Sequence, residues 1–364
     1  MTADPNPPPL GRGQILLRLG AIGAIVLIVV AIFAWAGGLF SPHRVTQRTL
    51  IDTFEQLNGE HAGFRRNHAK GICFAGTFES NGAGAQLSKA SVFASGRVPV
   101  IGRFALAGGQ PYAADASRTV RSMAVLFSLP DGEEWRSGMN NIPVFVVNSP
   151  QAFQEQLLAS RPDPATGKPD PARMKAFLAA HPETARAIGL IKNQSVSSGF
   201  ANTTYNGLDA FRFVDRAGVS TPVRWSMVPA QPFAPEDASA SSDKNSLFDT
   251  LIADAGRAPL QWHLVVTIAA PGDSTSDATV AWPDDRTHVD VGTLTVDRIE
   301  GEDSGACRDV NFDPLVLPSG IEPSDDPLLS ARSAAYSQSF TRRAGEKKTP
   351  SAVQTDASRK GGQP

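Results

Sequence analysis

The sequence predicts an α+β protein in which an antiparallel sheet or barrel follows one membrane-spanning helix. Three observations predict it: a charge-free apolar segment near the N-terminus, a series of short apolar or alternating runs separated by Gly, Pro, Asn and Asp, and a few helical patterns beside them. The chain has 364 residues, of which 41% are hydrophobic and 19% charged, as in ordinary globular proteins. Its net charge of −2 gives no basic field, so we expect no nucleic-acid partner.

The N-terminal apolar segment covers residues 19–40 and contains no charged residue. As a helix it would extend about 33 Å, which is enough to cross a hydrocarbon layer of roughly 30 Å. Arg12 and Arg18 precede it and Asp4 is the only acid there, so we expect residues 1–18 in the cytoplasm and the rest on the periplasmic or extracytoplasmic side. A cleaved signal peptide is the alternative, because Ala34-Trp35-Ala36 resembles a cleavage site. We favour an uncleaved anchor, since the run is longer than a usual signal core.

Helical spacing first recurs over residues 45–57, where Thr46 or Thr49 can cap the helix and Asn58-Gly59 can end it. From Gly71 onward, strand patterns dominate and predict about eight strands. They cover residues 72–78, 91–93, 98–104, 122–129, 142–147, 208–214, 223–228, 260–268 and 289–298.

Residues 152–158, 173–188 and 326–343 have helical patterns, and residues 230–245 have the composition of a surface loop. We therefore expect one folded domain over residues 45–343. Residues 344–364 contain almost no apolar side chains, so we expect a disordered tail.

Two cysteines, Cys73 and Cys307, are too few for a disulfide scaffold, and their spacing suits no zinc site. They can form one bridge in an oxidising compartment or remain two buried thiols, and the sequence leaves both open.

Three short stretches carry side chains that are common in active sites. His68 follows Arg65-Arg66-Asn67, Asn140-Asn141 precede an apolar run, and Arg332 lies one helical turn before Tyr336. Each has an ordinary structural explanation when taken alone: a solvated histidine, a pair of turn residues and an exposed cation–phenol pair.

Taken together and in order, these stretches resemble the haem catalases, in particular the small catalase-related peroxidases that keep the haem barrel alone. The matching stretches are residues 65–78, 102–104, 140–145, 311–314, 318–322 and 332–336. The resemblance extends over roughly residues 59–343 and implies an eight-stranded antiparallel catalase-like β-barrel.

The resemblance implies a role for each residue around a ferric haem b. Tyr336 would be the proximal iron ligand, as a phenolate, with the positive charge of Arg332 beside it. His68 would act as general base and then acid on the peroxide, and Asn140 would donate a hydrogen bond to it. Asn141 is the neighbouring alternative to Asn140.

Five further residues match positions that surround the haem in the family. Arg65, Arg103 and Arg343 would pair with the haem propionates. Phe145 and Phe153 would line the pocket, although core packing explains these two equally well.

The sequence departs from the large catalases in ways that bear on the reaction. Ala105 stands where catalases usually have a serine that orients the distal histidine, so we expect a loosely held His68. Asn67 replaces a valine that narrows the channel, and Ser337 replaces a proline. The long N-terminal arm and the C-terminal domain are also missing, so we expect a more open pocket, and a monomer or dimer.

These departures predict a peroxidase that reduces organic hydroperoxides, and to some extent hydrogen peroxide, with electrons from an unidentified donor. Weak catalase activity at most is expected. Three alternatives remain: a non-enzymatic haem-binding barrel, a haem enzyme that rearranges lipid hydroperoxides, and a periplasmic barrel without a cofactor.

Overall fold

The computed structural model describes residues 11–36, 45–115, 119–236 and 243–355. The chain divides into two compact units, Met1–Val45 and Thr46–Pro364. The stretches that resemble the haem catalases fall within the second unit, which contains every strand found among the described residues.

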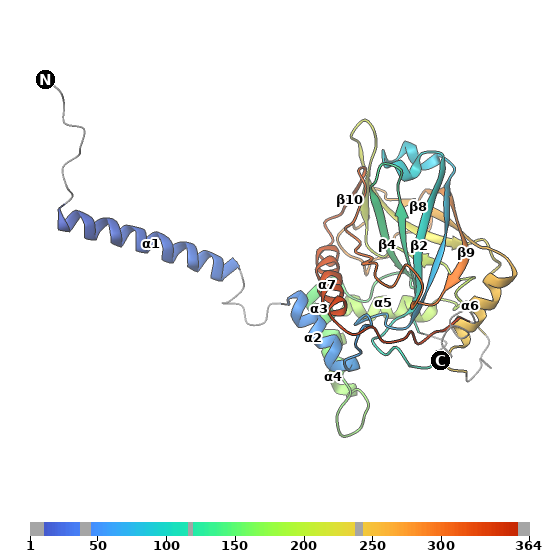
Figure 1. Cartoon of the computed structure of the whole chain (residues 1–364), viewed down its shortest axis with the longest axis horizontal. Coiled ribbons are helices and arrows are strands. Elements are labelled where there is room, and N and C mark those ends of the chain that lie inside the picture. Colours follow the sequence, from blue (N-terminus) through green and yellow to red (C-terminus); the bar gives the residue numbers. More distant parts are fainter. Residues whose placement is uncertain (1–10, 37–44, 116–118, 237–242, 356–364) are drawn as a thin grey trace. The chain divides into compact units, whose positions relative to one another are not determined.

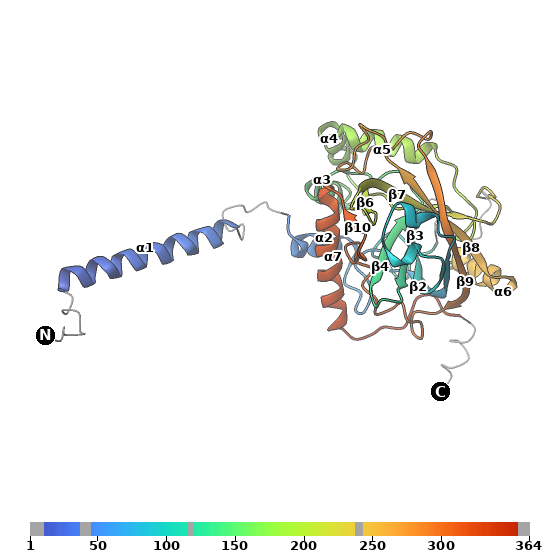
Figure 2. The ribbon, with the colours of Figure 1, turned by 90° about the horizontal axis from the view of Figure 1, so that it is seen from above.

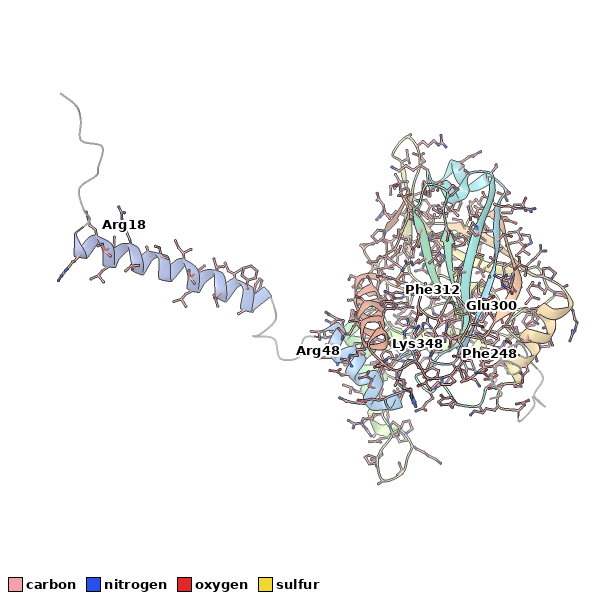
Figure 3. The ribbon with its side chains drawn as sticks, viewed as in Figure 1. Arg18, Arg48, Phe248, Glu300, Phe312 and Lys348 are labelled. Atoms are coloured by element: carbon pink, nitrogen blue, oxygen red, sulfur yellow. A yellow bond between two sulfur atoms is a disulfide. The ribbon has the colours of Figure 1, made fainter. Side chains whose placement is uncertain are left out.

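In the first unit the described residues form one long helix, α1 (Arg12–Ala36) (Figure 1). Arg18 lies near its start (Figure 3). Its length and apolar composition are sufficient to cross a membrane, and a signal sequence near the N-terminus meets the same criteria. The helix includes residues 19–36 of the expected span, and residues 37–40 lie outside the described residues.

The second unit is built on a closed antiparallel barrel, which confirms the predicted fold class. Eight strands close the barrel in the order β7-β5-β4-β3-β2-β1-β9-β8, and pairing of β8 with β7 completes it. β6 and β10 extend the sheet beside β7. The strands are β1 (Gly71–Ser80), β2 (Gly96–Leu106), β3 (Arg121–Ser128), β4 (Glu134–Asn140), β5 (Tyr205–Asn206), β6 (Phe211–Val214), β7 (Ser220–Pro229), β8 (Leu260–Ile268), β9 (His288–Glu300) and β10 (Ile321–Pro323).

Helices surround the barrel on two sides. α2 (Gln47–Asn58), α3 (Pro150–Ala159) and α7 (Pro327–Ala344) gather on one side, and α6 (Ser246–Arg257), which carries Phe248, lies on the other side (Figures 1, 2 and 3). α4 (Pro171–Ala180), α5 (Pro182–Asn193) and two short 3-10 helices, η1 (Ala83–Gln86) and η2 (Ser91–Phe93), complete the unit. The side chain of Thr46 caps α2 as half of a capping box with Thr49.

Alternation along the strands separates a packed interior from an outer face. On β3, Met123, Val125 and Phe127 belong to the barrel core, whereas Ser122 and Ala124 line a cavity outside it. The outer face of β2, β3 and β4 is therefore available to form a site.

Several predicted elements differ from the structure. Residues 91–93 form η2 rather than a strand, and the strand predicted over residues 142–147 is replaced by β4, which ends at Asn140. Pro143 has no N–H for a ladder, which is consistent with this early end. The helix predicted over residues 173–188 is divided between α4 and α5, because Pro182 interrupts the hydrogen-bond series. Helix α6 was not predicted.

The tail differs from the expected disorder over the part that the structure describes. Val353 is buried in the main core, Ser351 donates its backbone N–H to Asp303, and Lys348 pairs with Asp309. These contacts attach residues 348–353 to the second unit, and residues 356–364 lie outside the described part.

The two cysteines form a disulfide, which decides the alternative that the sequence left open. Cys73 on β1 is joined to Cys307, 234 residues later, and both are buried. The bond connects the barrel to the segment that leads toward α7.

Candidate active site

A cavity lies on the outer face of the barrel, between β2–β4 and the helices α2, α3 and α7. It encloses about 1340 Å³ of atom-free space, part of it open to solvent. All nine residues nominated from the sequence line it: Arg65, His68, Arg103, Asn140, Phe145, Phe153, Arg332, Tyr336 and Arg343.

The floor of the cavity consists of outward-facing positions on three neighbouring strands. Ala105, Ser122 and Asn140 form one cross-strand row, and Ala124 and Gly138 are partners in the next row. Three of these five residues are alanine or glycine, so their side chains project little into the cavity and leave room for a broad ligand.

The backbone of His68 is held in an uncommon conformation beside this floor. Its φ of 55° lies in the left-handed region, where non-glycine residues are rare. Asn67 Oδ1 accepts hydrogen bonds from the N–H groups of His68 and Gly108, at 3.0 Å and 2.9 Å. Arg103 Nη1 donates to the carbonyl of His68 at 2.8 Å. These contacts direct the imidazole into the cavity that it lines.

The imidazole of His68 is neutral at physiological pH. Burial lowers its pKa to about 3, and the positive charges of Arg103, Arg332 and Arg65 act in the same direction. A neutral ring is able to accept a proton, as a general base must.

The expectation that His68 is loosely held is wrong. Ser122 Oγ lies 3.0 Å from His68 Nδ1 and also donates a hydrogen bond to Asn140 Oδ1. The hydroxyl that Ala105 lacks is supplied from β3, because residues 105 and 122 are cross-strand neighbours that face the same side.

The structure separates the two adjacent asparagines. Asn140 lines the cavity, whereas Asn141 Oδ1 accepts the backbone N–H of Arg121 at 2.9 Å and holds the start of β3. Asn140 is therefore the residue of the pair that can meet a ligand.

Tyr336 and Arg332 lie together on α7, facing β4. A Cβ atom placed on Gly138 would be 3.5 Å from Tyr336 Oη and 3.6 Å from Arg332 Nη2, so both tips approach this strand. Arg332 also forms an ion pair with the buried carboxylate of Asp209. That carboxylate reduces the net positive charge that Arg332 would otherwise place near the phenol oxygen.

Arg65, Arg103 and Arg343 form a buried cationic cluster around Glu302. Glu302 Oε1 lies 3.0 Å from Arg65 Nη1 and 2.8 Å from Arg103 Nε. Burial alone would raise the pKa of Glu302, but the charges of the three arginines outweigh it and hold the pKa below its usual value. Burial, followed by the charge of Arg103, lowers the pKa of Arg343 to about 10. These four side chains carry a net charge of two positive units.

The cavity fits a haem by its charge and by its walls. Two surplus guanidinium charges match the two propionates of haem, which need cationic partners when buried. The phenol oxygen of Tyr336 is a known type of haem ligand. Apolar side chains form much of the wall: Leu50, Ile51, Phe54, Phe145, Phe153, Phe312 and Leu328.

Sequence reasoning missed three residues of this site: Ser122, Asp209 and Glu302. Each is far along the chain from the residue it contacts, and none lies in a recognisable motif. The alternation of residues along β3 places Ser122 and Ala124 on one face. This alternation was the only sequence signal that pointed to any of the three missed residues. Strand pairing was required to place Ser122 beside His68.

A barrel with a neutral histidine, a tyrosine and a cationic cluster around one apolar cavity is the architecture expected of a haem-binding barrel protein. The family model described as Catalase matches residues 37–354. This chain belongs to the catalase family. Proteins of this family use haem.

Two relatives are similar over most of their length. A catalase-related peroxidase from Synechococcus elongatus is 37% identical over 306 residues, covering 84% of this chain and 90% of the relative. A catalase-related peroxidase from Mycolicibacterium paratuberculosis is 34% identical over 304 residues, covering 83% of this chain and 96% of the relative. These relatives identify the chain as a haem peroxidase of the oxidoreductase class.

Larger catalases share the fold. A fungal catalase superimposes with a TM-score of 0.70 at 19% identity, over 84% of this chain and 66% of that structure. Catalase A from Saccharomyces cerevisiae superimposes with a TM-score of 0.70 at 20% identity, over 81% of this chain and 64% of that structure. The matched part of this chain therefore spans about two thirds of the length of these larger proteins.

Proposed function

We propose that this chain reduces organic hydroperoxides, and hydrogen peroxide less effectively, with electrons from a donor and with ferric haem b as cofactor. The observation that carries this proposal is the single cavity in which His68, Asn140, Tyr336 and the arginine cluster meet. Its apolar walls favour a peroxide with an organic substituent, because burial of that substituent is stabilising.

The roles of the side chains follow from their positions. Tyr336 would hold the iron through its phenol oxygen, and Arg65, Arg103 and Arg343 would pair with the propionates. When bound, haem would supply the redox chemistry that cleaves the O–O bond, and the electron donor would return the electrons used.

His68 and Asn140 would act on the peroxide from the barrel side. Nε2 of the neutral His68 takes the proton of the peroxide and returns it to the leaving oxygen. The amide nitrogen of Asn140 donates a hydrogen bond that orients the peroxide and stabilises charge on it.

We further propose that α1 anchors the enzyme, with the barrel on the periplasmic side. The buried Cys73–Cys307 disulfide supports export, since disulfides persist in oxidising compartments. The protein would act as a monomer or dimer with a peroxide and an electron donor as its partners, and without nucleic acid.

Replacement of Tyr336 tests the haem assignment. Purified wild-type protein should show the absorption spectrum of a tyrosinate-ligated ferric haem, and Tyr336→Phe should lose it. A histidine-type spectrum that survives Tyr336→Phe would reject this ligand.

Turnover of a peroxide panel tests the reaction. With a general peroxidase donor, kcat/KM for cumene hydroperoxide should exceed that for hydrogen peroxide, and oxygen release should be slow. Rapid oxygen release would show a catalase instead. Consumption of a fatty-acid hydroperoxide without a donor would show a rearranging enzyme, and haem binding without any turnover a haem-binding barrel.

A further inference from the structure

Ser122 connects two residues that line the cavity, His68 and Asn140. It belongs to the outer face of β3, directly between Ala105 on β2 and Asn140 on β4. The side chain lines the cavity, and the residue is 9% exposed. Its hydroxyl therefore contacts both neighbours from a buried position.

The single hydroxyl proton decides the direction of both hydrogen bonds. Oδ1 of Asn140 has lone pairs and no proton, so Ser122 must donate to it. The hydroxyl then has no proton left for His68 and accepts one from Nδ1, 3.0 Å away. A neutral imidazole with its proton on Nδ1 carries its lone pair on Nε2.

We propose that Ser122 is the positioning residue of this site, holding His68 in its Nδ1–H tautomer and Asn140 with its amide nitrogen toward the cavity. This inference rests on the proposed function. It means that one hydroxyl prepares both the proton acceptor, Nε2 of His68, and the hydrogen-bond donor, Nδ2 of Asn140.

The position of Ser122 explains how the site works with alanine at residue 105. Ala105 is the cross-strand neighbour of Ser122 on the same outer face. The hydroxyl reaches the imidazole from β3, where it can also contact Asn140.

Three variants of the haem-loaded protein separate positioning from simple packing. Ser122→Ala removes the hydroxyl, and Ser122→Thr retains it. Ser122→Ala combined with Ala105→Ser moves the hydroxyl to the neighbouring strand, where it can contact His68. Ser128→Ala, at the far end of β3 and outside the cavity lining, is the matched control.

Two measurements report on the site. The first is kcat/KM for cumene hydroperoxide. The second is the association rate of cyanide with the ferric protein, because hydrogen cyanide must lose its proton as it binds and this needs an oriented base. Ser122→Ala should lower both about tenfold, a size in keeping with the loss of one hydrogen bond. Ser122→Thr and the control should stay within about threefold of wild type.

The double variant gives the sharpest result. It should recover the cyanide rate, since His68 regains a hydroxyl partner. The inference is overturned if Ser122→Ala changes neither quantity, or if Ser122→Thr is as impaired as Ser122→Ala.

Proton NMR of the cyanide complex adds a spectroscopic check. The Nδ1–H of His68 should exchange slowly in wild type and faster in Ser122→Ala, and equal exchange would contradict the proposed hydrogen bond.

Failure of this inference differs from failure of the proposed function. A wild-type protein that binds haem and cyanide without turning over any peroxide would reject the function. The effect of Ser122→Ala on cyanide association would still be measurable.

Discussion

His68 combines an unusual backbone with an uncharged ring. Its positive φ costs on the order of 1–3 kcal/mol, and the contacts from Asn67 and Arg103 over-determine that conformation. Burial of the ring and the nearby arginine charges lower its pKa, so the ring remains unprotonated. A strained, neutral histidine of this kind indicates a residue that is positioned for chemistry.

The pKa of His68 predicts a dependence of stability on pH. The pKa is about 3 in the folded protein and near 6.5 in the unfolded chain, so between these values the unfolded chain binds the additional proton. The free energy of unfolding should therefore fall by up to about 1.4 kcal/mol for each pH unit below 6.5. Urea unfolding of wild type and His68→Gln between pH 7 and 5 measures it, and the variant should lack this loss.

The exposed His288 provides a control for that measurement. His288→Gln should retain the wild-type pH dependence. Parallel curves for wild type and His68→Gln would contradict a depressed pKa for His68.

Near Tyr336, Asp209 influences the charge of the site. Its buried carboxylate pairs with Arg332, whose guanidinium also lies 3.4 Å from the carbonyl of Gly138. We expect Arg332 to orient Tyr336 while Asp209 limits the positive charge beside the phenol oxygen.

Removal of the Asp209 charge should raise the ferric/ferrous midpoint potential of the haem-loaded protein. Asp209→Asn leaves Arg332 uncompensated, and the added positive charge favours the less positive, reduced iron. A shift on the order of 60 mV would correspond to about 1.4 kcal/mol for one electron. Spectroelectrochemical titration measures it, with Asp209→Glu as the charge-conserving control. An unchanged or lower potential in Asp209→Asn would show that the pair has no such effect.

At the scale of elements, the site depends on the register of three strands. β2, β3 and β4 present Ala105, Ser122 and Asn140 in one row because each strand alternates in phase with its neighbour. A shift of one residue in any pairing would turn these side chains into the barrel core. The surrounding helices complete the walls, and α7 carries both Arg332 and Tyr336 on one face.

The disulfide stabilises the connection between β1 and the segment before α7. Cys73, Cys307 and Phe312 share a small buried cluster against which Tyr336 packs, and Arg65 Nη2 donates to the carbonyl of Cys307 at 3.0 Å. Loss of the bond should therefore affect both stability and the cavity.

Replacement of both cysteines by alanine should lower the free energy of unfolding by about 2–5 kcal/mol, because the unfolded chain gains conformational freedom over a long loop. Urea unfolding measures the change, and titration with haem should show weaker binding. Wild-type protein whose disulfide has been reduced during unfolding is the matched comparison for the free energy of unfolding of the alanine variant. Identical stability of the alanine variant and wild type would exclude a structural role for the bond.

At the scale of the whole molecule, the cavity and its walls belong entirely to the second compact unit. All of the contacts that hold His68, Asn140 and Tyr336 come from residues after Thr46. Of the residues that the structure describes in the first unit, those of α1 included, none lines the cavity.

A chain without residues 1–42 should therefore keep its haem spectrum, its thermal midpoint and its peroxide turnover, and should no longer sediment with membranes. Fractionation of cells that produce each form measures this. A truncated form that remains with membranes would show that another part of the chain binds them. If cells that express the full-length chain yield a protein whose N-terminus lies after Ala36, the segment is a cleaved signal peptide and not an anchor.

The sequence by itself determined the features that depend on short stretches of chain. Apolar alternation and turn residues predicted the barrel strands, and a charge-free run predicted α1. The stretches around His68, Asn140 and Tyr336, taken together and in order, pointed to a haem site through their resemblance to the haem catalases.

Only the tertiary structure decided which partners these residues have. Ser122 meets His68, Asp209 meets Arg332, and Glu302 meets Arg103, across separations of 54, 123 and 199 residues. Contacts of this kind depend on strand register and on the docking of α7, and no local pattern encodes either. For the same reason the sequence predicted a loosely held His68, whereas the folded barrel supplies its hydroxyl partner from the neighbouring strand.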